Sequence, residues 1–166
     1  FLGDTTLTGG QLAERVSQYV QAFEALNAGT GVTVGLLSLN RPEVLMILGA
    51  SQTQGYRRTA LHPLGSLDDH AYVLSDCGAS SLIIDPNPMF VERALGLLEK
   101  VDSLKQILTI GPVPDELKQL GDQVVDLNAE AAKYEPTPLV VADLPPDHIG
   151  GMAYTGGTTG KQIGRA

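Results

Sequence analysis

The residues best suited to chemistry gather in one short stretch, YTGGTTGKQIGRA at residues 154–166, which holds four glycines, three threonines and a lysine. Successive glycines let the backbone adopt positive φ angles, so that consecutive N–H groups can point toward one anion. The threonine hydroxyls add further donors, and Lys161 adds a full positive charge. This composition predicts a phosphate-binding loop, and the alternative is a flexible glycine-rich terminus without a ligand.

The spacing within this stretch differs from two common nucleotide-binding motifs. A Walker A pattern needs glycine five positions before Gly160 and Ser or Thr after the lysine, whereas this chain has Thr155 and Gln162 there. No GxGxxG spacing occurs between residues 150 and 164. The segment HIGGMAYT at 148–155 reads as a strand that leads directly into the loop. Because ligands of open α/β sheets bind beyond the carboxyl ends of the strands, the position of the loop favours binding.

The elements that must position the loop follow from hydrophobic periodicity and capping residues. An apolar stripe with spacings of three and four predicts a first helix, which Thr8 and Gln11 cap at its start and Gly29 and Gly31 end. Further helices are expected from Pro42 to Gly55 and over 67–77, 90–101 and 128–134. Charge-free or β-branched runs predict strands over 32–40, 81–85, 106–111, 123–127 and 148–155. Residues 57–65 are expected to form a short strand that runs into a proline turn.

The alternation of strands and helices predicts an α/β fold with a mainly parallel sheet flanked by helices. The proline-rich stretch 136–146 is the one linker candidate. We therefore expect an N-terminal α/β subdomain over 1–147 and, over 148–166, a strand with the Gly/Thr-rich loop that begins a next, truncated subdomain. A chain that opens on Phe1 rather than Met is expected to lack its natural N-terminus.

Composition narrows the class of protein. The 166 residues suit one globular domain, and the formal charge of −8 argues against binding to nucleic acid or anionic lipid. The single cysteine, Cys77, excludes an internal disulfide and favours a reducing cytoplasm. No apolar run approaches the roughly 20 residues that a membrane span needs. The protein is therefore expected to be cytoplasmic, without a transmembrane segment; its oligomeric state is open.

Other reactive residue types carry no pattern that predicts a site. His62, His70 and His148 lack metal-ligand spacing and read as ordinary surface or loop histidines. Cys77 reads as a small buried apolar residue, because no neighbouring His or Lys would lower its pKa. Two charged pairs read as structural: Asp68-Asp69 as a first helical turn and Arg57-Arg58 as a solvated strand edge, although the arginines could touch an anion.

The loop TGGTTGK after a strand resembles the phosphate loop of the adenylate-forming superfamily, which includes acyl- and aryl-CoA synthetases, luciferases and the adenylation domains of peptide synthetases. That loop runs roughly Ser/Thr–Ser/Gly–Gly–Ser/Thr–Thr–Gly–x–Pro–Lys–Gly. The resemblance extends upstream through LTGGQLAERVSQYVQAFEALNAGTGVTVGLLSLNRPE, which is similar to the opening helix, strand and helix start of the family, and through LSDCGASSLIID. It implies a nucleotide phosphate site formed by Thr155, Gly156, Gly157, Thr158, Thr159, Gly160, Lys161 and Gly164.

The chain departs from the family pattern at two positions, where Gln162 and Ile163 stand in place of Pro and Lys. Lys161 lies two places before the position of the family lysine and has two interpretations. As a phosphate ligand it would supply the missing charge without strict geometry. As the variable residue of the pattern it would only point to solvent.

The resemblance implies that the full-length protein activates a carboxylic acid, with a fatty acid as first choice and an aromatic acid as second. ATP and Mg²⁺ would yield an acyl-adenylate, and the acyl group would pass to coenzyme A. In such proteins the catalytic and metal-binding residues lie beyond residue 166, so no catalytic or metal residue is expected here and the chain alone is expected to be inactive. The alternative is a non-catalytic α/β module, or a degenerate homologue, with a frayed glycine-rich tail.

Overall fold

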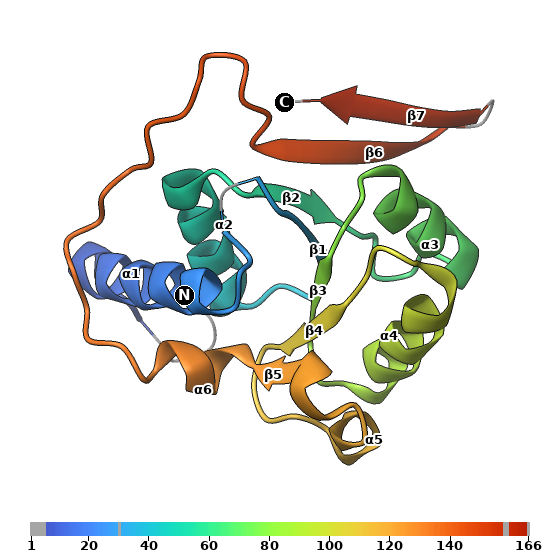
Figure 1. The fold of residues 1–166 in the computed structure, drawn as a ribbon, viewed down its shortest axis with the longest axis horizontal. Helices are drawn as coiled ribbons and strands as arrows, with labels where there is room; N and C mark the ends of the chain where they lie inside the picture. The colour runs from blue at the N-terminus through green and yellow to red at the C-terminus, as the bar shows by residue number, and fades with distance from the viewer. Residues whose placement is uncertain (1–5, 30, 158–159, 166) are drawn as a thin grey trace.

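A twisted seven-stranded sheet forms the centre of the computed structural model, which describes residues 6–29, 31–157 and 160–165 (Figure 1). Within these residues the strand order is β5-β4-β3-β1-β2-β6-β7. Six strands run parallel, and β7 pairs antiparallel with β6. The strands are β1 (Thr33–Leu37), β2 (Arg57–Ala60), β3 (Ser81–Ile84), β4 (Gln106–Thr109), β5 (Val124–Asp126), β6 (Gly151–Gly157) and β7 (Gly160–Arg165).

Helices cover both faces of the sheet. The longer ones are α1 (Gly9–Ala25), α2 (Pro42–Gln54), α3 (Leu67–Asp76) and α4 (Pro88–Lys100). The shorter ones are α5 (Asp115–Lys118), the 3₁₀ helix η1 (Gly121–Gln123) and α6 (Leu127–Ala131). α1, α2 and α6 pack together on one face, and α3, α4 and α5 lie on the other (Figure 1). None of the described helices is both long and apolar enough to cross a membrane.

Local sequence explains where the helices begin. Thr8 and Gln11 form a capping box at the start of α1, and Ser66 and Asp69 form another at the start of α3. α2 and α4 each begin with a proline, whose fixed φ angle suits a first helical turn. α2 ends at Gln54 and is capped by Gly55, whose φ of 70° lies in the left-handed region that favours glycine.

Each face of the sheet has its own apolar core, because successive strand residues point to opposite sides. In β3, Ile83 packs with the residues of α1 and α2, whereas Leu82 and Ile84 pack with α3 and α4. All five residues of β1 are buried. The central strands therefore read as continuous apolar runs, as expected for strands with helices on both sides.

The predicted α/β fold is confirmed, and the differences lie mostly at element ends. Over 57–65 the expected short strand is observed as Arg57–Ala60, and the expected proline turn closes with a hydrogen bond from the Gly65 N–H to the His62 carbonyl. The last expected strand, 148–155, is observed as β6 from Gly151 to Gly157. α5, η1 and β7 were not predicted.

The proline-rich stretch 136–146 is an irregular strap that passes beside α1 and α2 on the outside of the molecule (Figure 1). It donates a backbone hydrogen bond from Thr137 to the Ser17 hydroxyl of α1 at 3.1 Å and one from Ala142 to the Thr53 carbonyl of α2 at 2.8 Å. The strap leads into β6, which joins the same sheet by pairing with β2. The division into 1–147 and 148–166 stays a prediction.

Candidate functional site

The predicted phosphate-binding residues lie on the hairpin formed by β6 and β7. Thr155, Gly156 and Gly157 are the last residues of β6, and Gly160 and Lys161 begin β7. The pairing places Gly157 opposite Gly160 and Gly156 opposite Lys161. Gly164 lies further along β7, opposite Ala153. Thr158 and Thr159, predicted for the same site, lie outside the described residues.

The hairpin extends past the carboxyl end of β2. β6 pairs with β2 only at its start, where Gly151 is in register with Arg58 and Met152 with Thr59. The remaining residues of β6 continue beyond Ala60, the last residue of β2. The described part of the predicted loop therefore lies beyond the carboxyl edge of the sheet, where ligands of parallel sheets bind.

A second feature of this edge, which the sequence analysis did not identify, lies at the ends of β1 and β3. These strands are neighbours, but β1 leads into α2 on one face and β3 leads into α4 on the other. Such a reversal leaves a crevice between the two connections, and it is the usual ligand position in open α/β sheets. Here the crevice is a cavity of about 860 Å³. Its lining includes residues 39–43, 85–87 and parts of α1 and α6.

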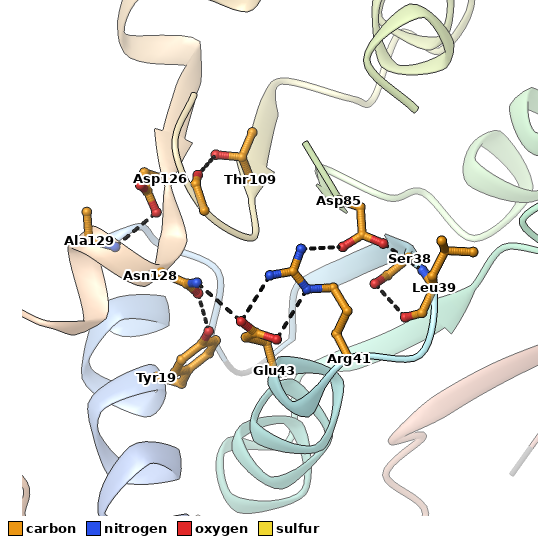
Figure 2. Close-up of polar contacts among 11 residues, drawn as sticks. Tyr19, Ser38, Leu39, Arg41, Glu43, Asp85, Thr109, Asp126, Asn128 and Ala129 are labelled. Atoms are coloured by element: carbon orange, nitrogen blue, oxygen red, sulfur yellow. Dashed lines mark hydrogen bonds and ion pairs between the residues drawn. The ribbon is translucent and has the colours of Figure 1, made fainter. Parts of the chain in front are cut away.

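A polar network centred on Arg41 forms one wall of this cavity (Figure 2). The guanidinium group donates to both carboxylate oxygens of Glu43, at 3.1 and 3.2 Å, and to Asp85 at 3.0 Å. The other oxygen of Asp85 accepts the Leu39 backbone N–H at 2.7 Å. Asp85, with a side chain only 5% exposed, thus joins the segment after β3 to the segment after β1.

The same network reaches α1 and α6. The Tyr19 hydroxyl of α1 donates to the side-chain oxygen Oδ1 of Asn128 in α6, and the side-chain Nδ2 of Asn128 lies 3.5 Å from a carboxylate oxygen of Glu43 (Figure 2). Burial raises the pKa of Tyr19 well above that of a free phenol, so the hydroxyl keeps its proton. Burial alone would raise the pKa of Glu43, but the hydrogen bonds from Arg41, the backbone and Asn128, together with the charge of Arg41, outweigh it and the net pKa is lowered. The hydrogen bond to Glu43 likewise holds the pKa of Arg41 above its ordinary value.

These contacts determine which chemical roles are open to the carboxylates of Glu43 and Asp85. Both carboxylates are engaged by Arg41, so they are hydrogen-bonded anions and not free general bases. The network therefore fixes the loops of the carboxyl edge and offers polar lining. In the sequence, Arg41 and Glu43 were read only as a helix start and Asp85 only as a strand end. Their positions just after two strands were the signal available.

The structure corrects two interpretations of the other reactive residues, those of His70 and of the Arg57-Arg58 pair. His70 is buried, not a surface or loop histidine: its ring lies 2.8 Å from the His62 carbonyl and 3.0 Å from Arg93. β2 lies between β1 and β6, so Arg57 and Arg58 are half-buried on an interior strand and not on a strand edge. His62 is exposed and His148 is half-buried.

Two other interpretations of the sequence agree with the structure. Cys77 is buried, and burial raises the pKa of its thiol to about 11, which makes the thiolate rare at neutral pH. Asp68 and Asp69 lie in the first turn of α3, where Asp68 pairs with Lys100 at 2.8 Å and Asp69 completes the capping box.

Comparison with known proteins gives one family. The family model described as "AMP-binding enzyme" matches residues 1–164. A medium/long-chain-fatty-acid–CoA ligase, FadD8 of Mycobacterium tuberculosis (strain ATCC 25618 / H37Rv), is 79% identical over 164 residues. That match covers 99% of this chain but 28% of the ligase, so the chain spans little more than a quarter of its length.

Solved structures give the same fold. An anthranilate CoA ligase, AuaEII, in complex with anthranoyl-AMP superposes with a TM-score of 0.85 at 24% identity, over 99% of this chain and 30% of that one. The amide bond synthetase McbA from Marinactinospora thermotolerans superposes with a TM-score of 0.77 at 25% identity, over 98% of this chain and 30% of that one. These likenesses confirm the predicted arrangement of sheet and helices.

Proposed function

Because this chain belongs to the AMP-binding enzyme family, we propose that its full-length protein is an ATP-dependent acid–thiol ligase. A carboxylate oxygen of the acid attacks the α-phosphorus of ATP, and the bond from that phosphorus to the bridging oxygen breaks, releasing pyrophosphate. The thiol sulfur of coenzyme A then attacks the acyl carbon of the acyl-adenylate, and AMP leaves with the electron pair of the broken C–O bond. The thiol proton passes to base or solvent.

The observation that carries this proposal is the 79% identity to a medium/long-chain-fatty-acid–CoA ligase over nearly the whole chain. It favours a fatty acid of medium or long chain over an aromatic acid. It also makes the alternative, a non-catalytic module with a frayed tail, the less favoured one. We propose a cytoplasmic location, in keeping with the free thiol of Cys77.

The part of this chain in the reaction is to hold the outer phosphates of ATP. Backbone N–H groups from Thr155 to Gly160 would face the β- and γ-phosphates, and Gly164 would allow the returning strand to lie close. Binding of this kind lowers the barrier by fixing ATP in line with the acid and by stabilising the departing pyrophosphate. Lys161 would add its charge to the same group or point to solvent.

Magnesium would reach the site with the nucleotide. Among the described residues, no three or more His, Cys, Asp or Glu side chains gather into a metal site. Mg²⁺ is commonly held by substrate phosphates with only one or two carboxylates, so its binding with ATP does not need a cluster of three or more. We therefore assign no step of the reaction to a metal held by these residues.

ATP–pyrophosphate exchange by the full-length protein, across fatty acids of increasing length and aromatic acids, tests this proposal. We expect exchange with medium- and long-chain acids and release of AMP when coenzyme A is added. Absence of exchange with every acid, in a protein that is folded, would contradict the proposed function. Exchange that appears only after Gln162→Pro and Ile163→Lys are introduced together would instead show a degenerate phosphate loop. This chain alone is expected to form no acyl-adenylate.

A further inference from the structure

The hairpin that carries the predicted phosphate loop has little support from the sheet. Its register with β2 ends at Met152, whereas β6 continues to Gly157. Beyond that point, in the described part of the chain, its strand partner is β7, which belongs to the same hairpin. A loop that must hold triphosphate in a fixed place needs another anchor, because small displacements of binding groups are costly in catalysis.

Tyr154 provides that anchor, immediately before Thr155. Its hydroxyl donates to a carboxylate oxygen of Asp76, at the end of α3, at 2.6 Å. This length is typical of a hydroxyl that donates to a charged carboxylate. Its ring also meets the ring of Tyr72, one helical turn earlier on α3, edge to face, with centroids 6.5 Å apart and an interplanar angle of 84°. Figure 1 shows the far half of β6 lying over α3.

The ring contact with Tyr72 and the hydrogen bond to Asp76 restrict different motions of the hairpin. The ring contact, together with packing of Met152 and Tyr154 on the core beneath α3 and α4, holds the strand against the helix. The hydrogen bond to Asp76 sets the direction of the ring, because a hydroxyl–carboxylate bond is directional. Burial and the bond to Asp76 raise the pKa of Tyr154 well above that of a free phenol, so the donor is present at every physiological pH.

We propose that Tyr154 and Asp76 are positioning residues for ATP: they fix the β6–β7 hairpin on α3 so that the backbone amides from Thr155 onward face the phosphates. This inference rests on the proposed function. It adds that α3, which lies outside the predicted loop, sets the affinity of the loop for its nucleotide.

The test is the kinetics of ATP–pyrophosphate exchange in the full-length protein with saturating fatty acid. Tyr154→Phe keeps the ring and removes the hydrogen bond, and we expect KM for MgATP to rise about fivefold, or about 1 kcal/mol, with kcat within about twofold. Tyr154→Ala also removes the ring contact, and kcat/KM for MgATP should fall by roughly 30-fold or more. Asp76→Leu should match Tyr154→Phe, and Asp76→Asn, which keeps an acceptor, should restore most of the affinity.

A matched control exists in Tyr134, whose hydroxyl donates to Glu130 at 3.0 Å within the segment around α6. Tyr134→Phe makes the same chemical change away from the hairpin, and it should leave KM for MgATP unchanged. A merely structural role for Tyr154 would lower the unfolding midpoint and leave KM for MgATP alone, and that result would overturn the inference. So would an equal rise in KM for the fatty acid, or no rescue by Asp76→Asn. Failure of the wild-type protein to exchange pyrophosphate would count against the proposed function instead.

Discussion

The two halves of the carboxyl edge are built differently. At the ends of β1 and β3, contacts centred on Arg41 join the segments after both strands to α2, and through Glu43 they continue to α1 and α6. At the end of β6, the described hairpin leaves its sheet partner after Met152 and is held on α3 through Tyr154. The first half is therefore held by contacts among several elements, whereas the described hairpin of the second half depends on few contacts outside itself.

The largest expected effect comes from breaking the contacts of the first half. Arg41→Ala removes the partner of Asp85, which is buried, and of Glu43. Removing one partner of a buried ion pair leaves the other as an uncompensated charge. Because Arg41 is partly exposed to water, we expect the free energy of unfolding to fall by about 2–3 kcal/mol. Urea unfolding of the full-length protein measures it. Lys118→Ala, which breaks the exposed pair with Asp115, should have no measurable effect. Equal losses of stability in Arg41→Ala and Lys118→Ala would contradict the view that the Arg41 network stabilises this half of the edge more than an exposed ion pair does.

A smaller loss of stability is expected from a substitution in the turn after β2, which lies between the two halves of the carboxyl edge. A Cβ at Gly65 would collide with the buried ring of His70, which also holds the His62 carbonyl. Overpacking of this kind costs about 1–3 kcal/mol, so Gly65→Ala should lower the urea midpoint of the full-length protein. At Gly29 a Cβ would meet nothing within 4 Å, and Gly29→Ala is therefore the control. No loss in Gly65→Ala would mean that the turn is free to move.

The same turn should make stability depend on pH. Burial lowers the pKa of His70 below its ordinary value of 6.5 and the charge of Arg93 adds to the effect, whereas the hydrogen bond to the His62 carbonyl and the charge of Asp69 oppose it. The unfolded chain therefore binds the proton more readily, and the contribution of neutral His70 is present above about pH 6.5 and is lost as the pH falls below it. The change cannot exceed about 1.4 kcal/mol per pH unit. The free energies of unfolding of wild type and His70→Gln, measured in urea between pH 8 and 5, should converge toward low pH. A difference that stays constant over this range would contradict the prediction.

The smallest effect on global stability is expected in the hairpin half. Tyr154→Ala removes only the contacts that hold β6 on α3, so the free energy of unfolding in urea should stay within about 0.5 kcal/mol of wild type. Local opening should nevertheless increase. Amides of residues 151–155 should exchange with deuterium about tenfold faster, whereas those of β1 should not change. Uniform acceleration across both segments would show that the two halves are not independent.

Local rules allowed much of the fold to be predicted from the sequence. The capping box at Thr8, Ser66 as an N-cap, the proline at position 42 and the glycine at position 55 indicated helix ends that the structure confirms. The buried strands were evident because residues such as those of β1 are apolar on both faces. The glycines, threonines and lysine of residues 154–166 and their position after a strand pointed to a phosphate loop, and the family resemblance favoured this interpretation over a flexible terminus.

What could not be predicted depends on distant contacts. Tyr19 and Asn128 are 109 residues apart, and nothing in either local pattern indicates that they meet beside Glu43. β7 was missed because its glycine-rich sequence lacks the alternation of a strand; its pairing with β6 supplies the missing preference. His70 was misjudged because its burial depends on Arg93, from another helix.

The most direct test of the central claim is calorimetric titration of MgATP into the full-length protein, compared with a variant in which residues 155–160 are replaced by an unrelated stretch of equal length. If the backbone amides of the hairpin hold the outer phosphates, the replacement should weaken binding at least about tenfold, or about 1.4 kcal/mol, and the urea midpoint should be retained. Equal affinity of the two proteins for MgATP, or no binding by either, would contradict the claim.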